Sequence, residues 1–227
     1  IYVISSYSQE DNVITAAQVQ TAKNKGWEVK AQFDNSYVDW PGEHGLQIIR
    51  RHFPSYEFRQ FLHSRPFGED SYITNEELAE VTEINLNDTF NWTVKDATGI
   101  GHFPALKYLT CSDNKLTSLD VSKNTNLEKL YCGDNSLEAL DVSKNTKLTY
   151  LSCRNNSLTS LDVSQNKALE ELYCFGNNLT SLTISSTKNT ALKMVACSKN
   201  NISGEAMTNL VNSLPVRPNH DGNFRVC

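Results

Sequence analysis

Apolar residues return along the middle of the chain at a fixed interval of 21 residues. Each copy holds a leucine, a second leucine three positions on, a cysteine two positions further, an asparagine, and three more aliphatic residues. The first copy consists of Leu106, Leu109, Cys111, Asn114, Leu116, Leu119 and Val121. The next three copies begin at Leu127, Leu148 and Leu169. Seven matched positions in four copies indicate one structural unit that is repeated in tandem.

The pattern continues in a weaker form on both sides of these four copies. A fifth copy begins at Leu192, after an insertion of two residues, and its pattern breaks after Ile202. Upstream, Val81, Ile84 and Leu86 repeat the spacing of three and then two residues. We therefore expect a divergent first strand before the first full copy.

Within each copy, the apolar spacing predicts a short strand, a turn at the asparagine, and an extended segment that returns the chain. One such coil cannot bury its own apolar edge, so neighbouring coils must stack. The spacing matches the leucine-rich-repeat signature, with cysteine in the third apolar position. The predicted fold class is α/β: a right-handed leucine-rich-repeat solenoid with a parallel β-sheet on the concave face and helical caps.

Two polar positions recur together with the apolar ones. The first column follows each strand, where we expect buried side-chain amides to satisfy backbone groups of the turn. This column contains Asn114, Asn135, Asn156, Asn177 and Asn200. The second column contains Asn124, Asn145, Asn166 and Asn189. Because it lies in an SKNT-type turn, we expect its side chains to bond to the local backbone.

A cysteine occupies the same inward position in every copy. These residues are Cys111, Cys132, Cys153, Cys174 and Cys197. Parallel strands in register place equivalent Cα atoms about 4.8 Å apart, with the side chains pointing in one direction. The Cβ atoms are then too far apart for the roughly 3.8 Å that a good disulfide prefers. We expect free, buried thiols, and the lack of a CxxC motif argues against a zinc site.

An open solenoid exposes apolar edges and needs a cap at each end. Residues 45–100 predict a helical N-terminal cap followed by the divergent first strand. The segment FPSYEFRQFLHSR has helical apolar spacing, and Thr74 with Glu77 predicts a capping box before a second helix. The same region faintly resembles a calcium-binding loop containing Asp70. The first and third positions of that loop lack oxygen ligands, so the sequence does not predict a calcium site.

The remaining segments lie outside the repeats of residues 101–202. Residues 203–227 predict a helix that stops at Pro215 and one more strand, which together form an incomplete C-terminal cap. Residues 1–44 have no repeat of their own and predict a strand, a helix that ends at Gly26, and another strand.

The LTSLDVSKNT coil and its flanking segments resemble secreted or surface leucine-rich-repeat proteins of Bacteroides-like anaerobic bacteria, with an internalin-like array. The resemblance covers nearly the whole chain. In that family, a segment similar to MTNLVNSLP and GNFRVC continues into one similar to NVITAAQVQTAKNKGW, and together they follow the array. The resemblance implies that residues 1–44 correspond to the C-terminal cap of a preceding array in a longer tandem protein. It also implies an extracellular or cell-surface location.

In this chain the segment similar to the C-terminal cap lies at the beginning, in residues 1–44. Ile1 to Ile4 is similar to Phe224 to Cys227, which suggests that the two segments occupy equivalent places in such an array. One hypothesis is head-to-tail self-association, in which Ile1–Ile4 pairs by strand addition with Phe224–Cys227 of another molecule or of the same one.

Alternate residues of each strand point away from the core, toward the concave face. The candidate ligand-binding residues on this face are Tyr108, Lys129, Tyr131, Tyr150, Arg154, Glu171, Tyr173 and Phe175. Tyrosine alternates between two neighbouring columns and forms a staggered aromatic band. Tyrosine and arginine are enriched at binding hot spots. The alternative interpretation is that tyrosine simply suits exposed strands.

Composition and charge narrow the possible functions. A net charge of −5 and a pI near 5.6 provide no broad basic face for nucleic acid. No stretch approaches the roughly 20 apolar residues of a membrane span. The five histidines form no HExxH motif, and no GxSxG motif or phosphate-binding glycine loop accompanies them. We therefore predict that the chain is not an enzyme and binds neither metal nor cofactor.

The favoured function is an extracellular or surface module for protein interaction or adhesion, which binds a protein or glycan on its concave face. Two alternatives stay open: a structural spacer in a larger tandem-repeat surface protein, and a carbohydrate-binding module. A spacer needs no aromatic band, which separates it from the other two.

Overall fold

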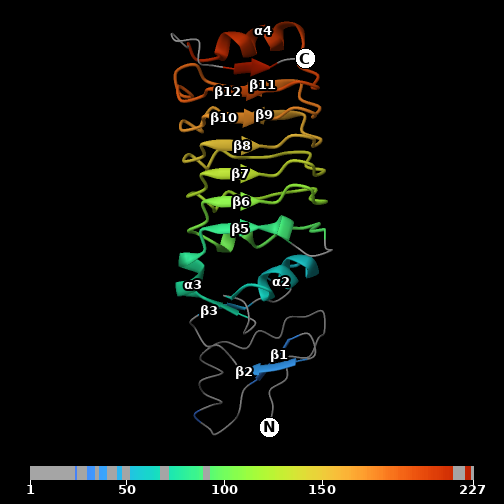
Figure 1. Ribbon diagram of the computed structural model, residues 1–227, viewed down its shortest axis with the longest axis vertical. Helices are drawn as coiled ribbons and strands as arrows, with labels where there is room; N and C mark the ends of the chain where they lie inside the picture. The colour runs from blue at the N-terminus through green and yellow to red at the C-terminus, as the bar shows by residue number, and fades with distance from the viewer. Residues whose placement is uncertain are drawn as a thin grey trace.

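The molecule contains a long stack of coils placed between two helical segments (Figure 1). Each coil of the stack corresponds to one repeat of the sequence. The computed structural model describes Asn24 and residues 30–33, 36–39, 45–47, 52–66, 72–88, 93–216 and 223–225.

One parallel sheet runs along the whole stack. Its seven strands are β5 (Glu83–Asn85), β6 (Tyr108–Thr110), β7 (Lys129–Tyr131), β8 (Tyr150–Ser152), β10 (Glu171–Tyr173), β12 (Met194–Ala196) and β13 (Asn223–Arg225). They pair in the order β13-β12-β10-β8-β7-β6-β5. Leu109 pairs with Leu130, and Leu130 pairs with Leu151, so the register advances by one sequence repeat per strand. The predicted parallel sheet is confirmed.

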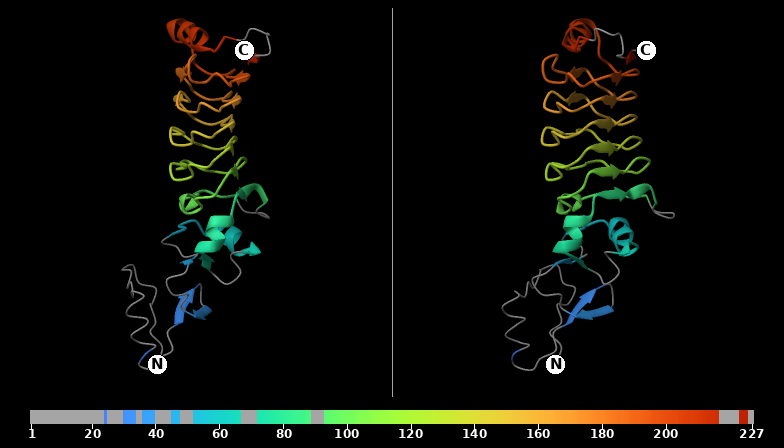
Figure 2. Two further views of the ribbon diagram at one scale, coloured as in Figure 1. Left: turned by 90° about the vertical axis from the view of Figure 1, so that its left-hand side faces the viewer. Right: turned by 60° about the vertical axis from the view of Figure 1, so that its left-hand side comes forward.

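The return half of each coil lies on the other side of the stack from the sheet, as Figure 2 shows. Two return segments, β9 (Ser160–Asp162) and β11 (Ser181–Thr183), form a parallel pair of their own. The leucines of both halves point inward, and Leu151 from a strand and Leu158 from a return segment are fully buried. The repeat therefore builds one continuous core, and the predicted leucine-rich-repeat solenoid is confirmed.

The first asparagine column ties each coil to the preceding one. The backbone N–H of Leu137 donates to Asn156 Oδ1 at 2.9 Å. Asn156 Nδ2 donates to the carbonyl oxygens of Cys132 at 3.0 Å and Cys153 at 3.1 Å. Cys132 belongs to the preceding coil and Cys153 to the same one, so a single amide satisfies backbone groups on both. The predicted ladder of side-chain amides is confirmed.

The second asparagine column differs from the local turn bonding that we expected. Asn145 Nδ2 donates to the carbonyl oxygens of Val121 at 3.0 Å and Asn124 at 2.9 Å, both in the preceding coil. Asn145 is fully buried, so its amide reaches backbone groups of the neighbouring coil rather than those of its own turn. Only at Asn189 do the described residues also show a local bond, from the N–H of Ser185 to Oδ1 at 2.8 Å.

The five cysteines of the repeats are free and buried, as predicted. Burial raises the pKa of the Cys111 thiol to about 12 and that of Cys197 to about 11. Thiolate is the reactive form of cysteine, so these side chains contribute packing rather than nucleophilic chemistry at neutral pH.

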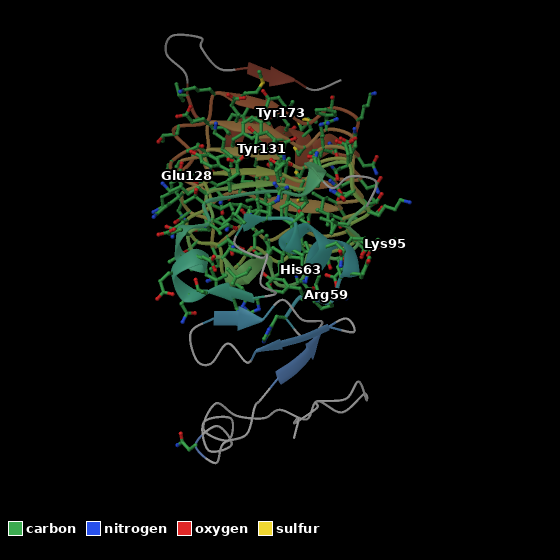
Figure 3. All side chains as sticks on the ribbon, turned by 60° about the horizontal axis from the view of Figure 1, so that its bottom comes forward. Arg59, His63, Lys95, Glu128, Tyr131 and Tyr173 are labelled. Atoms are coloured by element: carbon green, nitrogen blue, oxygen red, sulfur yellow. The ribbon has the colours of Figure 1, made fainter. Side chains whose placement is uncertain are left out.

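Two helices cover the N-terminal end of the stack. They are α2 (Tyr56–His63) and α3 (Asn75–Glu80). Helix α2 begins after Ser55, whose Oγ accepts the N–H of Phe58 at 3.2 Å. The buried guanidinium of Arg59, labelled in Figure 3, donates to the carbonyl oxygen of Phe53 at 2.7 Å and so fixes the approach to this helix.

Helix α3 begins with the predicted capping box. The N–H of Glu77 donates to Thr74 Oγ1 at 3.1 Å, and the N–H of Thr74 donates to Glu77 Oε2 at 2.8 Å. The Glu77 carboxylate therefore caps a helix, whereas Asp70 of the calcium-like loop lies outside the described residues. Strand β4 (Tyr72–Thr74) pairs antiparallel with β3 (Gly45–Gln47) just before this helix. Two short 3-10 helices, η2 (Leu86–Asp88) and η3 (Ile100–His102), follow.

The C-terminal end carries helix α4 (Gly204–Ser213) and strand β13, in agreement with the predicted helix and strand. Leu210 of α4 is buried against the end of the apolar core. Strand β13 extends the sheet by pairing parallel with β12.

Before helix α2, β1 (Lys30–Phe33) pairs antiparallel with β2 (Ser36–Asp39). Strand β1 lies within the second strand predicted for residues 1–44. The predicted first strand, including Ile1–Ile4, lies outside the described residues, as do all but one residue of the predicted helix. Within the described ranges, none of the helices has the length and apolar character needed to cross a membrane. The division of the chain into four segments stays a prediction.

Candidate functional site

The outward-facing side of the seven-stranded sheet, which we call the sheet face, is the candidate binding surface. Each strand is three residues long, and in β5, β6, β7, β8, β10 and β12 the middle residue points into the core. In β8 the middle residue, Leu151, is fully buried, whereas Tyr150 is half-buried on the outer side. Because side chains alternate along a strand, the first and third residues of these six strands face outward.

Strand pairing arranges these outward residues in columns that run along the stack. The first column contains Tyr108, Lys129, Tyr150, Glu171 and Met194. The second contains Thr110, Tyr131, Ser152, Tyr173 and Ala196. The columns agree with the register expected from the sequence, and they bring the candidate tyrosines of neighbouring coils together.

Three tyrosines form a continuous stack of rings, which we call the tyrosine row: Tyr131, Tyr150 and Tyr173. The ring centroids of Tyr131 and Tyr150 are 4.7 Å apart with an interplanar angle of 31°, and those of Tyr150 and Tyr173 are 5.5 Å apart at 35°. Figure 3 labels the two outer members, Tyr131 and Tyr173, one above the other on the stack. The row joins three consecutive coils.

The middle ring of the row comes from the other column. Ser152 stands between Tyr131 and Tyr173 in their own column, and it is only 6% exposed. Its small side chain leaves space above the sheet that the ring of Tyr150, from the same strand, fills. Burial and the neighbouring groups Tyr131, Tyr173 and Glu171 raise the pKa of Tyr150 to about 12. The Tyr150 hydroxyl is therefore neutral at physiological pH.

Glu171 lies beside the row and is bonded to it. The hydroxyl of Tyr173 donates to Glu171 Oε2 at 2.8 Å. In the first column, Glu171 lies between Tyr150 on β8 and Met194 on β12. This bond directs the hydroxyl of Tyr173 toward the first column and uses one acceptor position of the Glu171 carboxylate.

Tyr108 and Lys129 form the N-terminal part of the candidate surface. Lys129 Nζ lies 5.9 Å from the centroid of the Tyr108 ring. The hydroxyl of Tyr108 donates to Glu128 Oε2 at 3.3 Å. The structure therefore places Tyr108 against its own charged neighbours, and no ring contact among the described residues joins it to the tyrosine row.

Arg154 lies on the other flank of the sheet face, across Gly133 of the preceding coil. A Cβ atom at Gly133 would lie 2.8 Å from Arg154 Cγ, so glycine allows the arginine stem to lie flat. Arg154 Nη2 and Asp134 Oδ2 form an ion pair at 2.7 Å. Phe175 follows in the next coil and is half-buried, but no contact among the described rings connects it to the row.

A column of mostly charged residues just before the strands was not predicted from the sequence. Lys107 Nζ pairs with Glu128 Oε1 at 3.5 Å, and Lys193 Nζ pairs with Glu170 Oε2 at 2.9 Å. A lysine and a glutamate occupy this repeat position in neighbouring coils at both ends of the array, with Thr149 in the middle, and that was a visible signal. The column borders the sheet face with paired charges.

The sheet face offers aromatic rings, hydroxyl groups and a few charges, which are groups common at binding surfaces. Among the described residues, no three histidine, cysteine, aspartate or glutamate side chains are grouped as a metal site would require. A role for the candidate residues in binding stays a prediction.

Comparison with known proteins agrees with this architecture. Residues 104–145 match the leucine-rich-repeat family, as two copies of the repeat. The internalin InlF from Listeria monocytogenes superposes with a TM-score of 0.60 at 20% identity, over 75% of this chain and 50% of the internalin. A leucine-rich-repeat protein of Leptospira interrogans gives a TM-score of 0.53 at 25% identity, over 58% of this chain and 35% of that protein.

A further solved structure is the functional domain of InlJ from Listeria monocytogenes, which includes a cysteine ladder. It is 29% identical, covers 70% of this chain and 44% of its own, and has a TM-score of 0.49. This chain thus spans half or less of the length of these three structures. Among proteins with curated functions, none matches the sequence.

Proposed function

We propose that this chain is an extracellular or cell-surface recognition module that binds a protein partner on its sheet face and has no catalytic role. The observation that carries the proposal is the tyrosine row, three ring-stacked tyrosines on consecutive coils. The location rests on the resemblance to secreted and surface leucine-rich-repeat proteins of Bacteroides-like bacteria.

The tyrosine row suits binding because its side chains are already ordered. Each ring contacts a neighbour, so the tyrosines lose little side-chain entropy when a partner docks against them. Tyrosine also combines apolar area with a polar hydroxyl, which is why it is enriched at hot spots of protein interfaces. The row stands on a sheet that is hydrogen-bonded from coil to coil, which gives it a rigid base.

The ring geometry favours a protein over a glycan. Carbohydrate-binding modules stack sugar rings on exposed aromatic faces, but both faces of Tyr150 are occupied by its neighbours. The row therefore presents ring edges and hydroxyls outward. A carbohydrate-binding module stays the alternative for the outer members of the row.

The spacer alternative requires only the solenoid core. A spacer would tolerate any polar residues in the outward columns and needs no stack of rings. The presence of the row therefore favours recognition, and the two functions separate in a binding experiment.

The experiment is a screen of the wild-type chain against arrays of extracellular proteins and glycans. A Tyr131→Ala, Tyr173→Ala variant removes the outer members of the row. A Thr159→Ala, Ser160→Ala variant is the matched control, because these exposed residues lie on the return side of the coil. Thermal unfolding first verifies that all three proteins are folded.

We expect protein hits for the wild type and the control, with signals at least tenfold weaker for the tyrosine variant. Loss of about 1.4 kcal/mol of binding energy accounts for such a change, which is within the range of a single hot spot. Hits that survive in the tyrosine variant would contradict the sheet face as the binding site. Folded proteins without any hits would favour the spacer.

A second proposal concerns self-association at the open end of the sheet. In the described part of the chain, β13 pairs with β12 on one edge and with no strand on the other. We propose that Ile1–Ile4 of a second molecule adds to this edge, as the similarity of these residues to Phe224–Cys227 suggests. Edge strands readily accept another strand through their free backbone groups.

Sedimentation velocity over a range of protein concentrations tests this second proposal. We expect concentration-dependent association of the wild type and a monomer for Val3→Pro, because proline removes a backbone donor and disfavours strand pairing. Val3→Ala is the control that keeps the donor. A wild-type protein that stays monomeric at high concentration contradicts the proposal.

A further inference from the structure

The charges of the sheet face are not all compensated. Three acidic side chains near the strands have a basic partner in an adjacent coil: Glu128 with Lys107, Asp134 with Arg154, and Glu170 with Lys193. Glu171 differs from them. In the described part of the chain it takes part in no ion pair, and its hydrogen-bond partner is the neutral hydroxyl of Tyr173.

Among the described residues, the neighbours of Glu171 along the first column are uncharged: the ring of Tyr150 and the half-buried thioether of Met194. One carboxylate can accept about four hydrogen bonds, and Glu171 receives one from the described residues. Its carboxylate thus lies at the edge of the tyrosine row with acceptor capacity that the described part of the chain does not use.

The hydroxyl groups next to Glu171 also favour a ligand that donates hydrogen bonds. Tyr173 gives its hydroxyl proton to Glu171, so its oxygen lone pairs can only accept further bonds. An ordinary tyrosine hydroxyl is uncharged at neutral pH and burial raises the pKa of Tyr150 further, so this hydroxyl adds no negative charge beside the carboxylate. The Glu171 carboxylate therefore matches a ligand rich in N–H donors.

We propose that Glu171 is the anchor for a cationic side chain, foremost arginine, of the protein that docks on the tyrosine row. The guanidinium group carries five N–H donors in a planar fork and no acceptor, which fits a carboxylate with unused acceptor positions. The charge-assisted pair also compensates a carboxylate that would otherwise be desolvated without a cation on docking. This inference rests on the proposed function, because it names the partner chemistry of the same face.

Selection from a random peptide library displayed on phage tests the inference while the partner is still unidentified. The full chain is immobilised as the wild type, as Glu171→Gln, as Glu171→Lys and as Glu170→Gln. The glutamine at position 171 keeps an acceptor for the Tyr173 hydroxyl, so the row stays in place while the charge is lost. Glu170→Gln is the matched control, since it removes the neighbouring carboxylate, which is already paired with Lys193.

We expect peptides selected on the wild type and on Glu170→Gln to be enriched in arginine by about threefold or more over the unselected library. This enrichment disappears on Glu171→Gln and turns into enrichment of aspartate and glutamate on Glu171→Lys. Equal arginine enrichment on the wild type and on Glu171→Gln would overturn the proposal, and so would its absence on the wild type.

A Tyr131→Ala, Tyr173→Ala sample separates this inference from the proposed function. Peptides that bind the wild type without basic residues, and are lost from the tyrosine variant, contradict the role of Glu171 while supporting the binding face. Peptides that bind every variant equally contradict the binding face itself.

Discussion

Asparagine side chains connect one coil to the next on both sides of the core. Asn156 satisfies backbone groups at the end of the strand, and Asn145 does so in the turn that follows the return segment. An amide is suited to this task because its NH2 group donates twice while its oxygen can accept. A leucine at either position would leave buried backbone carbonyls with fewer partners, so the periodic asparagines are as much a part of the core as the leucines.

Replacing Asn145 by alanine tests this role. The variant loses two hydrogen bonds in a fully buried turn, to the carbonyls of Val121 and Asn124. Both carbonyls keep a backbone partner, so we expect the free energy of unfolding to fall by about 2 kcal/mol rather than more. Urea denaturation measures the loss. Thr146→Ala, at the exposed next residue, is the control and should change stability by less than about 0.5 kcal/mol.

Residue patterns in the sequence predicted one asparagine column correctly and the other incorrectly. The Asn156 column follows directly from its place between a strand and a turn. The Asn145 column resembles a local turn motif because serine and threonine surround it, and only the stacking of coils reveals that its amide crosses to the neighbour. The angle between tyrosine rings is a matter of side-chain rotamers, so the sequence could indicate the band but not the stacking of Tyr150 over Ser152.

At the scale of elements, the N-terminal cap contains a half-buried histidine contact. His102 of η3 lies edge-on to His52 and Phe53, with ring centroids 5.7 Å apart in both cases. Burial lowers the pKa of His102, and the nearby His52 and Lys123 lower it further. The folded protein therefore prefers neutral His102, and the unfolded chain binds a proton there more readily.

This shift makes the stability of the cap depend on pH. The stabilising contribution is complete above the unfolded pKa of about 6.5, and it falls as the pH drops toward the lower pKa of the folded state. We expect the urea midpoint to decrease between pH 7.5 and pH 5, and to decrease less in His102→Gln. Asp120 and Asp141 have a lowered pKa, and the stability that these carboxylates contribute is lost only below pH 5. An unchanged pH profile in His102→Gln would show that another group is responsible.

The elements were predictable to different degrees. Helix α3 was predicted by its capping box, and β13 was predicted as a strand after helix α4. Strands β1 and β2 pair antiparallel in a region where a single strand was expected, although the Asp34-Asn35 pair between them is a turn signal in the sequence. The 3-10 helix η3, which holds His102, had no sequence signal of its own.

At the scale of the whole molecule, stacking converts a repeated sequence into a surface with aligned columns. A residue that differs between repeats lies next to its counterpart in the adjacent coil, as Tyr131 lies next to Ser152. Sequence differences between the repeats therefore form a two-dimensional pattern of side chains on the sheet face. The return side carries the more uniform residues of the repeat, so most of the side-chain differences that a partner can recognise lie on the sheet face.

Photocrosslinking to a protein ligand from the array screen locates the binding surface most directly. A benzoylphenylalanine placed at Lys129, on the sheet face, is compared with one at Ser160, which is exposed on the return side of the coil. We predict crosslinks to the ligand from position 129 and none above background from position 160. Crosslinking from position 160 alone, or equally from both positions, would contradict the claim that the sheet face is the recognition surface.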